Sequence, residues 1–305
     1  MNKKKIKRWQ TKLQPIIEQY QAANISRNAV VVAYYALLSI FPLMIFLGNL
    51  LPLLDLKVDD VLKYIKVLVP ASIYHNLLPL IKSFLTNGNG GLLSIGALVT
   101  LWSASKGIVN LRKSVNDVYG IKTPQNALIS RIISVLLTLV FILIMMAIVL
   151  AFGFGQDILN YVVPRLQLPP LILQLFAQLR LPVAGIMLLI LLMLLLYMIP
   201  NAKLHFRCIL PGAILTAAGW LILAQVFAIY VRYFASSVTS YGAIGAFIIL
   251  MFWLDFIAEI LLLSSFVNRL TEEHFYGEIK PSKGKVRDFI ENRQQKKDSK
   301  PSAND

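Results

Sequence analysis

Acidic residues and cysteine are scarce in this chain. Only 15 of the 305 residues are Asp or Glu, and Cys208 is the single cysteine, which excludes an intrachain disulfide. The three histidines, His75, His205 and His274, are far apart and form no recognisable metal motif. Phosphodiester hydrolysis usually needs a metal-binding cluster of acids or histidines in an aqueous site, and none is evident. We therefore expect no enzyme activity and no cofactor.

Charge of either sign is also scarce, whereas apolar residues dominate. Charged residues make up 15% of the chain and hydrophobic residues 57%, with a mean hydropathy of +0.67. Such a chain is too apolar for a water-soluble domain and too long for one membrane span. Its apolar segments are unbroken runs of about 20 residues rather than alternating strands of about ten. The sequence predicts an all-α, polytopic membrane protein.

The apolar runs predict a bundle of six transmembrane helices. Their expected bounds are about 29–54, 91–110, 127–153, 181–199, 209–233 and 242–266. Between the first two spans, short amphipathic stretches are expected to lie on the extracytoplasmic surface. Three prolines are candidate helix kinks, because a proline frees a backbone carbonyl. They are Pro42, Pro200 and Pro211.

The flanking segments differ from this membrane domain, which we place at 29–270. Residues 1–28 form a basic amphipathic segment, and residues 271–305 a charged tail expected to be disordered. With six spans, 23 of the 30 basic residues fall on one side, so both termini should be cytoplasmic. The same rule explains the net charge of +15 without a nucleic-acid partner. We expect the lipid bilayer as partner, with anionic-lipid contacts through the basic tails; a homo-oligomer or an envelope partner stays open.

Two acids lie inside the last expected span, in FWLDFIAEILLLSSF at 252–266. Asp255 and Glu259 are four residues apart and so share one helical face. Each costs about 2.5 to 3.5 kcal/mol near a bilayer centre. At 1.5 Å per residue they lie roughly 20 and 26 Å from the outer end of their span. Lys106 lies roughly 22 Å from the outer end of the second span, in the same layer.

This shared depth suggests that Lys106 faces Asp255 and Glu259 across the bundle. One negative charge would remain in excess, able to bind a proton or a cationic group of a substrate. Alternatively, the three residues form a buried ion pair that only locks helices together, or Glu259 reaches the interface. Further polar partners for this candidate intramembrane site are Ser39, Ser103, Ser105 and Asn110.

Four segments together resemble the YihY/virulence factor BrkB family, long labelled ribonuclease BN-like. They are AYYALLSIFPL at 33–43, LLSIGALVTLWSASKGIVNLRKSVNDVYG at 92–120, IPNAKLHFRCILPGA at 199–213 and SYGAIGAFIILMFWLDFIAEILLL at 240–263. The resemblance implies a six-helix protein of the inner or cytoplasmic membrane, with a poorly defined activity for which transport is often suspected. In the last span Asp255 stands where the family typically has Tyr, and Phe266 where it has Glu. The role of that acidic position therefore does not carry over directly.

Two functions are compatible with these observations. The first is a transporter or a lipid/amphiphile translocation factor that uses the buried polar layer. The second is a non-transport scaffold that recruits partners through its tails. The sequence has no Walker-type phosphate loop, so transport driven by bound nucleotide would require another subunit.

Overall fold

The described part of the chain is helical. The computed structural model describes residues 14–50, 93–121, 171–239 and 242–282, with short pieces between 58 and 85 and between 160 and 169. The elements are α2 (Ile25–Leu50), α5 (Leu93–Val118), α8 (Leu171–Met198), the 3-10 helix η3 (Phe206–Ile209), α9 (Leu210–Thr239) and α10 (Gly242–Tyr276). A further helical segment at 14–23 precedes α2. Within the described ranges, extended pairing occurs only as an isolated bridge between Ala202 and Pro281.

The all-helical class expected from the sequence is confirmed, but the number of spans stays a prediction. The expected span at 127–153, most of 55–90 and the tail from 283 lie outside the described residues. Two helices in the described part are long and apolar enough to cross a membrane, Phe206–Tyr230 and Phe247–Tyr276. A shorter apolar helix covers Gly185–Met198.

Two helices run beyond the ends expected from hydropathy. α5 continues past residue 110 to Val118, and α10 continues past residue 266 to Tyr276. The extra turns are polar but contain no helix breaker. Each helix is followed by a glycine in the left-handed region, Gly120 with φ +69° and Gly277 with φ +79°. Glycine adopts this conformation without steric penalty, so it ends a helix efficiently.

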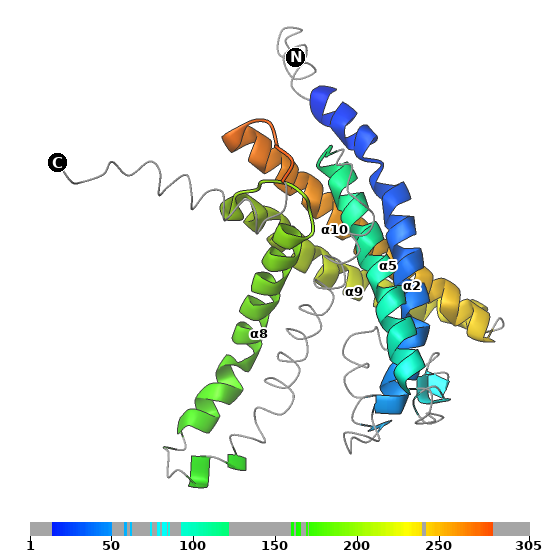
Figure 1. Ribbon diagram of the computed structural model, residues 1–305. Coiled ribbons are helices and arrows are strands. Elements are labelled where there is room, and N and C mark those ends of the chain that lie inside the picture. Colours follow the sequence, from blue (N-terminus) through cyan, green and yellow to red (C-terminus); the bar gives the residue numbers. More distant parts are fainter. Residues whose placement is uncertain are drawn as a thin grey trace.

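The helices pack as two pairs that cross one another. α2 lies along α5, and α10 packs against α9 and also against α2 (Figure 1). α8 contacts α9 and η3. Small residues permit the close approach of α9 to α10: a Cβ added at Gly219 would lie 2.7 Å from Cγ2 of Ile260.

The expected proline kinks take different positions. Pro42 lies inside α2, as expected for a kink. A proline outside the three candidates, Pro182, lies inside α8. Pro200, by contrast, is buried in the connection between α8 and η3, and Pro211 lies at the junction of η3 and α9. At a helix start the missing N–H has no intrahelical partner in any case, so Pro211 disrupts no hydrogen bond.

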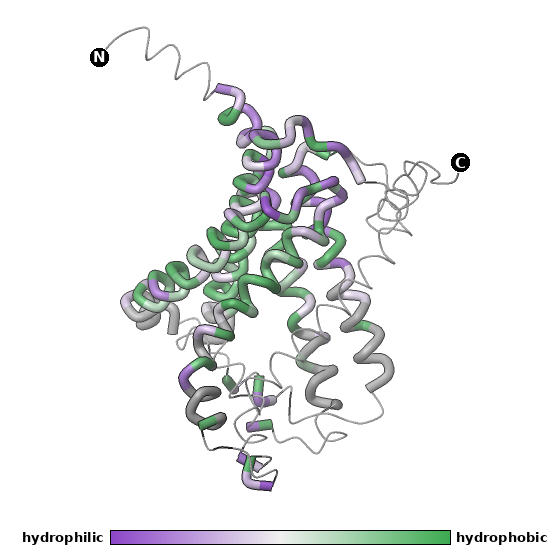
Figure 2. The backbone as a smooth tube through the Cα atoms, turned by 90° about the vertical axis from the view of Figure 1, so that its left-hand side faces the viewer, coloured by the Kyte–Doolittle hydropathy of each residue, from purple (hydrophilic) through white to green (hydrophobic). Residues whose placement is uncertain are grey.

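Polar and apolar residues separate along the molecule. Hydrophilic residues gather at the end where the 14–23 helix lies, and apolar residues dominate the middle (Figure 2). On α9, large apolar side chains are exposed, among them Leu221, Ile222, Val226 and Ile229. Exposed apolar side chains of this kind suit contact with lipid tails.

Candidate functional site

The residues of the predicted intramembrane site lie on three helices. Ser39 is on α2, Ser103, Ser105, Lys106 and Asn110 are on α5, and Asp255 and Glu259 are on α10. These helices contact one another, so the fold brings the right elements together. The side chains, however, find different partners from those expected.

Glu259 is bound by a serine of α2. The hydroxyl of Ser26 donates a 2.8 Å hydrogen bond to Oε1 of Glu259. Ser26 is in the first turn of α2, ahead of the apolar run, which is why hydropathy alone did not select it. The contact ties α2 to α10 through a neutral donor rather than a cation.

Lys106 does not form the expected ion pair. Its Nζ lies 3.8 Å from the ring centroid of Trp102, one turn earlier on α5. Within the described residues, neither Asp255 nor Glu259 forms a salt bridge with it. A cation over an indole face is stabilised by the ring quadrupole, so Lys106 has a partner on its own helix.

Asp255 is the least satisfied of the predicted residues. The side chain is half-buried, and its Oδ1 is fully buried without a hydrogen-bond partner. Glu259, one turn further along α10, is directed to Ser26. Asp255 therefore has a buried carboxylate oxygen that no hydrogen bond engages.

The remaining predicted partners do not converge on the acids. Ser39 Oγ donates to the carbonyl of Tyr35 at 2.7 Å, and Asn110 Nδ2 donates to the carbonyl of Lys106 at 2.8 Å. Both bonds stay within one helix. Ser103 is half-buried, and Ser105 is buried with its hydroxyl unpartnered.

A second polar layer lies at the hydrophilic end and was not anticipated. Arg112 on α5 donates through Nη2 to Oδ1 of Asn201, in the connection between α8 and η3. The backbone N–H of Asn201 donates to Oδ1 of Asn116 at 2.8 Å, and its carbonyl accepts from the N–H of Ser282 at 2.7 Å. We call Arg112, Asn116 and Asn201 the Arg112 cluster. All three side chains are buried.

Glu272 anchors the same connection to α10. Its side chain is 2% exposed, and its carboxylate accepts from the backbone N–H of His205 at 3.1 Å. Nδ1 of His205 lies 2.6 Å from Oε1 of Glu272, and the His205 ring stacks on Tyr276 with centroids 3.5 Å apart. One turn earlier on α10, Asn268 Oδ1 accepts a 2.8 Å bond from the N–H of Gly212.

Residue spacing could have revealed this layer. Arg112, Asn116 and Tyr119 follow at steps of four and three, and Asn268 and Glu272 at a step of four. Each set therefore lies on one face of its helix. The expected span bounds, however, place these positions in cytoplasmic loops and the tail, where polar residues are usually solvated.

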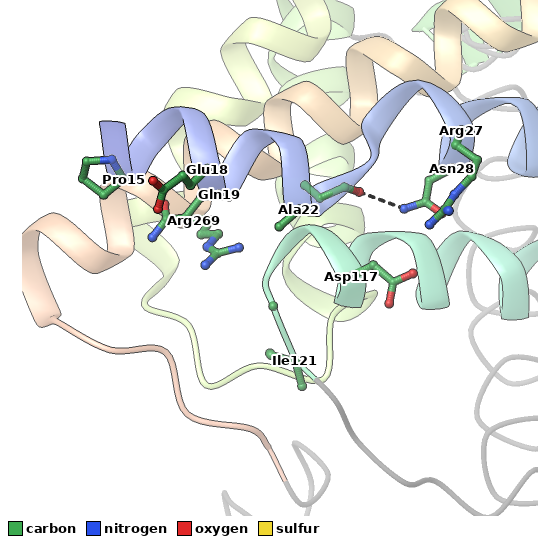
Figure 3. A pocket seen from close by; sticks show the side chains of 11 residues that line it. Pro15, Glu18, Gln19, Ala22, Arg27, Asn28, Asp117, Ile121 and Arg269 are labelled. Carbon is green, nitrogen blue, oxygen red and sulfur yellow. Dashed lines mark hydrogen bonds between the residues drawn. The ribbon is translucent and has the colours of Figure 1, made fainter. Parts of the chain in front are cut away.

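A pocket of about 660 Å³ opens at the same end, between the 14–23 helix, the end of α5 and α10 (Figure 3). Charges of both signs line it, namely Glu18, Arg27, Asp117 and Arg269. Arg269 is held in place, because Nε donates to Glu273 and Nη1 to the carbonyl of Val118, both at 2.8 Å. Within the described residues, no group of three or more His, Cys, Asp or Glu could hold a metal ion.

Comparison with known proteins supports the resemblance seen in the sequence. The chain is 33% identical over 258 residues to the ribonuclease-like protein YfkH of Bacillus subtilis (strain 168). The alignment covers 85% of this chain and 94% of that protein. No solved structure matches it significantly. The family described as Virulence factor BrkB matches residues 16–288. The chain is therefore a member of the BrkB family of membrane proteins.

Proposed function

We propose that this protein is a secondary transporter or a lipid/amphiphile translocation factor. In this proposal it crosses the cytoplasmic membrane six times, with both termini in the cytoplasm. The observation that carries the proposal is the unengaged carboxylate oxygen of Asp255, which is buried between helices. An ionisable group in a membrane span is rare, and it commonly belongs to a substrate or proton pathway.

The contacts of the two acids on α10 favour a binding role for Asp255 and a structural role for Glu259. Glu259 has a partner on another helix and serves to hold α2 against α10. Asp255 has no such partner at Oδ1, and Lys106 is occupied by Trp102. Asp255 can thus take up a proton or the cationic group of a substrate at Oδ1. Glu259 would first have to give up its hydrogen bond with Ser26.

The surface of the helices favours an amphipathic substrate. Apolar side chains of α9 are exposed along its length, and Ile186 and Ile190 are exposed on α8. A substrate with an acyl chain could remain in contact with lipid along these helices while its head group enters the bundle. We therefore include lipid and amphiphile translocation in the proposal alongside transport of small solutes.

Neutralising Asp255 tests the proposal. The full-length protein is reconstituted in liposomes that carry a fluorescent lipid, and translocation is followed by quenching from one side. The Asp255→Asn variant should accumulate in the membrane at the wild-type level. It should neither translocate the lipid nor complement the phenotype of a deletion strain. Glu259→Gln is the matched control on the same face, and it should lower stability more than activity. Equal activity of Asp255→Asn and wild type in both assays would refute the role of Asp255.

Removal of the tail distinguishes transport from a scaffold that works through its tails. The deletion should begin after Ser282, because two backbone hydrogen bonds hold residues 280–282 in the fold. Lys203 N–H donates to the carbonyl of Lys280, and Ser282 N–H donates to that of Asn201. A deletion of 283–305 keeps both bonds. It should leave translocation and complementation intact, whereas loss of complementation with normal translocation would favour the scaffold.

A further inference from the structure

Arg112 carries a buried positive charge that the described residues do not neutralise. Its side chain is 5% exposed, and its one hydrogen bond is made to the neutral amide of Asn201. Nε and Nη1 are buried and have no hydrogen-bond partner. In the part of the chain that the structure describes, no carboxylate forms an ion pair with this guanidinium. Buried charges are normally paired, so the cluster lacks an anion.

The surrounding polar groups do not supply that anion. Glu272, the buried carboxylate at this end, is engaged by the backbone N–H and the ring of His205. Oδ1 of Asn116 accepts from the backbone of Asn201, and Oδ1 of Asn201 already accepts from Arg112. Other buried groups without a partner at this end, Tyr119 Oη and Asn268 Nδ2, are both able to donate. None of these neighbours therefore brings a negative charge to the guanidinium.

The depth of Arg112 indicates which anions can reach it. It is 19 residues from Leu93 at the start of α5, or roughly 28 Å along the helix axis. This is close to the thickness of the hydrocarbon core, about 30 Å. With α5 as the second span of the proposed six, Arg112 lies near the level of lipid phosphates and of the adjoining aqueous phase.

We infer that the Arg112 cluster is a binding site for a phosphate group, carried either by a lipid head group or by a soluble phosphate. Guanidinium groups bind phosphate through several charge-assisted hydrogen bonds. Nε and Nη1 offer three N–H donors, and a phosphate oxygen would replace Oδ1 of Asn201 at Nη2. This site is separate from Asp255, and its existence does not depend on the transport proposal.

The backbone contacts of Asn201 allow such an exchange. The N–H and carbonyl of Asn201 are held by Asn116 and Ser282, so the main chain stays in place when the side chain turns away. In the present state Oδ1 of Asn201 occupies Nη2, one of the donors of the guanidinium. The amide therefore acts as a weak substitute for the missing anion.

Thermal stability measured with defined probes tests the inference. The full-length protein in a phosphate-free maltoside detergent receives inorganic phosphate, glycerol phosphate or phosphatidylglycerol, with chloride at equal ionic strength as reference. At saturation the wild-type Tm should rise by at least about 4 °C. Arg112→Gln should lose this rise, and Lys113→Gln, which changes the exposed neighbour on the same helix, should keep it. A response to soluble phosphates identifies a soluble ligand, and a response to phosphatidylglycerol alone identifies a lipid.

Asn201→Asp provides an independent test if Arg112→Gln fails to accumulate. The new carboxylate would stand beside the guanidinium and supply the missing charge. We expect a higher Tm without added phosphate, and no further rise when phosphate is added. The inference is overturned if no probe stabilises the wild type, if Arg112→Gln responds like wild type, or if Asn201→Asp still responds fully.

Discussion

The hydroxyl of Ser26 donates a 2.8 Å hydrogen bond to Oε1 of Glu259, although the residues are 233 positions apart in the chain. This bond joins the start of α2 to the middle of α10. It gives one acid of α10 a partner without introducing a cation, and it leaves Asp255 as the acid with an unengaged oxygen. The two carboxylates on one helical face therefore have different surroundings.

Removing the Ser26 hydroxyl should weaken the contact between α2 and α10. Hydrogen bonds to charged groups contribute about 1.5 to 3 kcal/mol, and because this one is exposed to solvent screening it should contribute less than that. We expect Ser26→Ala to reduce the free energy of unfolding by about 1 kcal/mol, measured by thermal denaturation in detergent. Ser39→Ala is the control, because Ser39 bonds only within α2. In a double-mutant cycle, Ser26→Ala should have little effect once Glu259 is Gln; additive effects would contradict the coupling.

Gly212 should tolerate no side chain. A Cβ at this position would lie 2.4 Å from Oδ1 of Asn268, which is buried and accepts from the Gly212 N–H. We expect Gly212→Ala to lower the free energy of unfolding by about 1 to 3 kcal/mol, as overpacking usually does. Gly185→Ala is the matched control in α8, where nothing lies within 4 Å of the added Cβ. It should be neutral or stabilising by up to about 1 kcal/mol, because alanine favours helix over glycine. Similar losses in both variants would argue against the packing of Asn268 on α9.

Ionisation of Tyr119 should lower the free energy of unfolding at alkaline pH. Burial raises its pKa well above the ordinary value, because the phenolate would lose its hydration. A raised pKa means that the unfolded chain loses the proton first, near pH 10. The contribution to stability is therefore complete below about pH 10 and is lost progressively above it. Between pH 9 and 11 the Tm of Tyr119→Phe should decrease less than that of wild type.

A tyrosine on the surface provides the comparison for this effect. Tyr233 of α9 is largely exposed, so Tyr233→Phe should follow the wild-type pH curve. At neutral pH, Tyr119→Phe should be close to wild type, because the Tyr119 hydroxyl is buried without a hydrogen-bond partner. Identical alkaline curves for all three proteins would show that Tyr119 does not contribute.

The helices were predictable, whereas most of the polar contacts were not. Hydropathy placed helices at the positions of α2, α8, α9 and α10, but it ended α5 before Arg112 and α10 before Glu272. Hydropathy averages residues along the chain, so polar turns that continue a helix resemble loops. The predicted pairing of Lys106 with the acids relied on equal depth, and depth says nothing about the direction in which a side chain points.

The sequence by itself determined the helical class, the apolar character of the helices and the family to which the chain belongs, because these properties depend on residue types and their order. Tertiary structure alone decided that Ser26 bonds to Glu259, that Lys106 lies over the ring of Trp102 and that Arg112 donates to Asn201. Such contacts depend on how each helix is rotated about its axis and where it crosses its neighbours. Those quantities follow from the packing of many small side chains at once, including Gly212 and Gly219, and no local pattern encodes them.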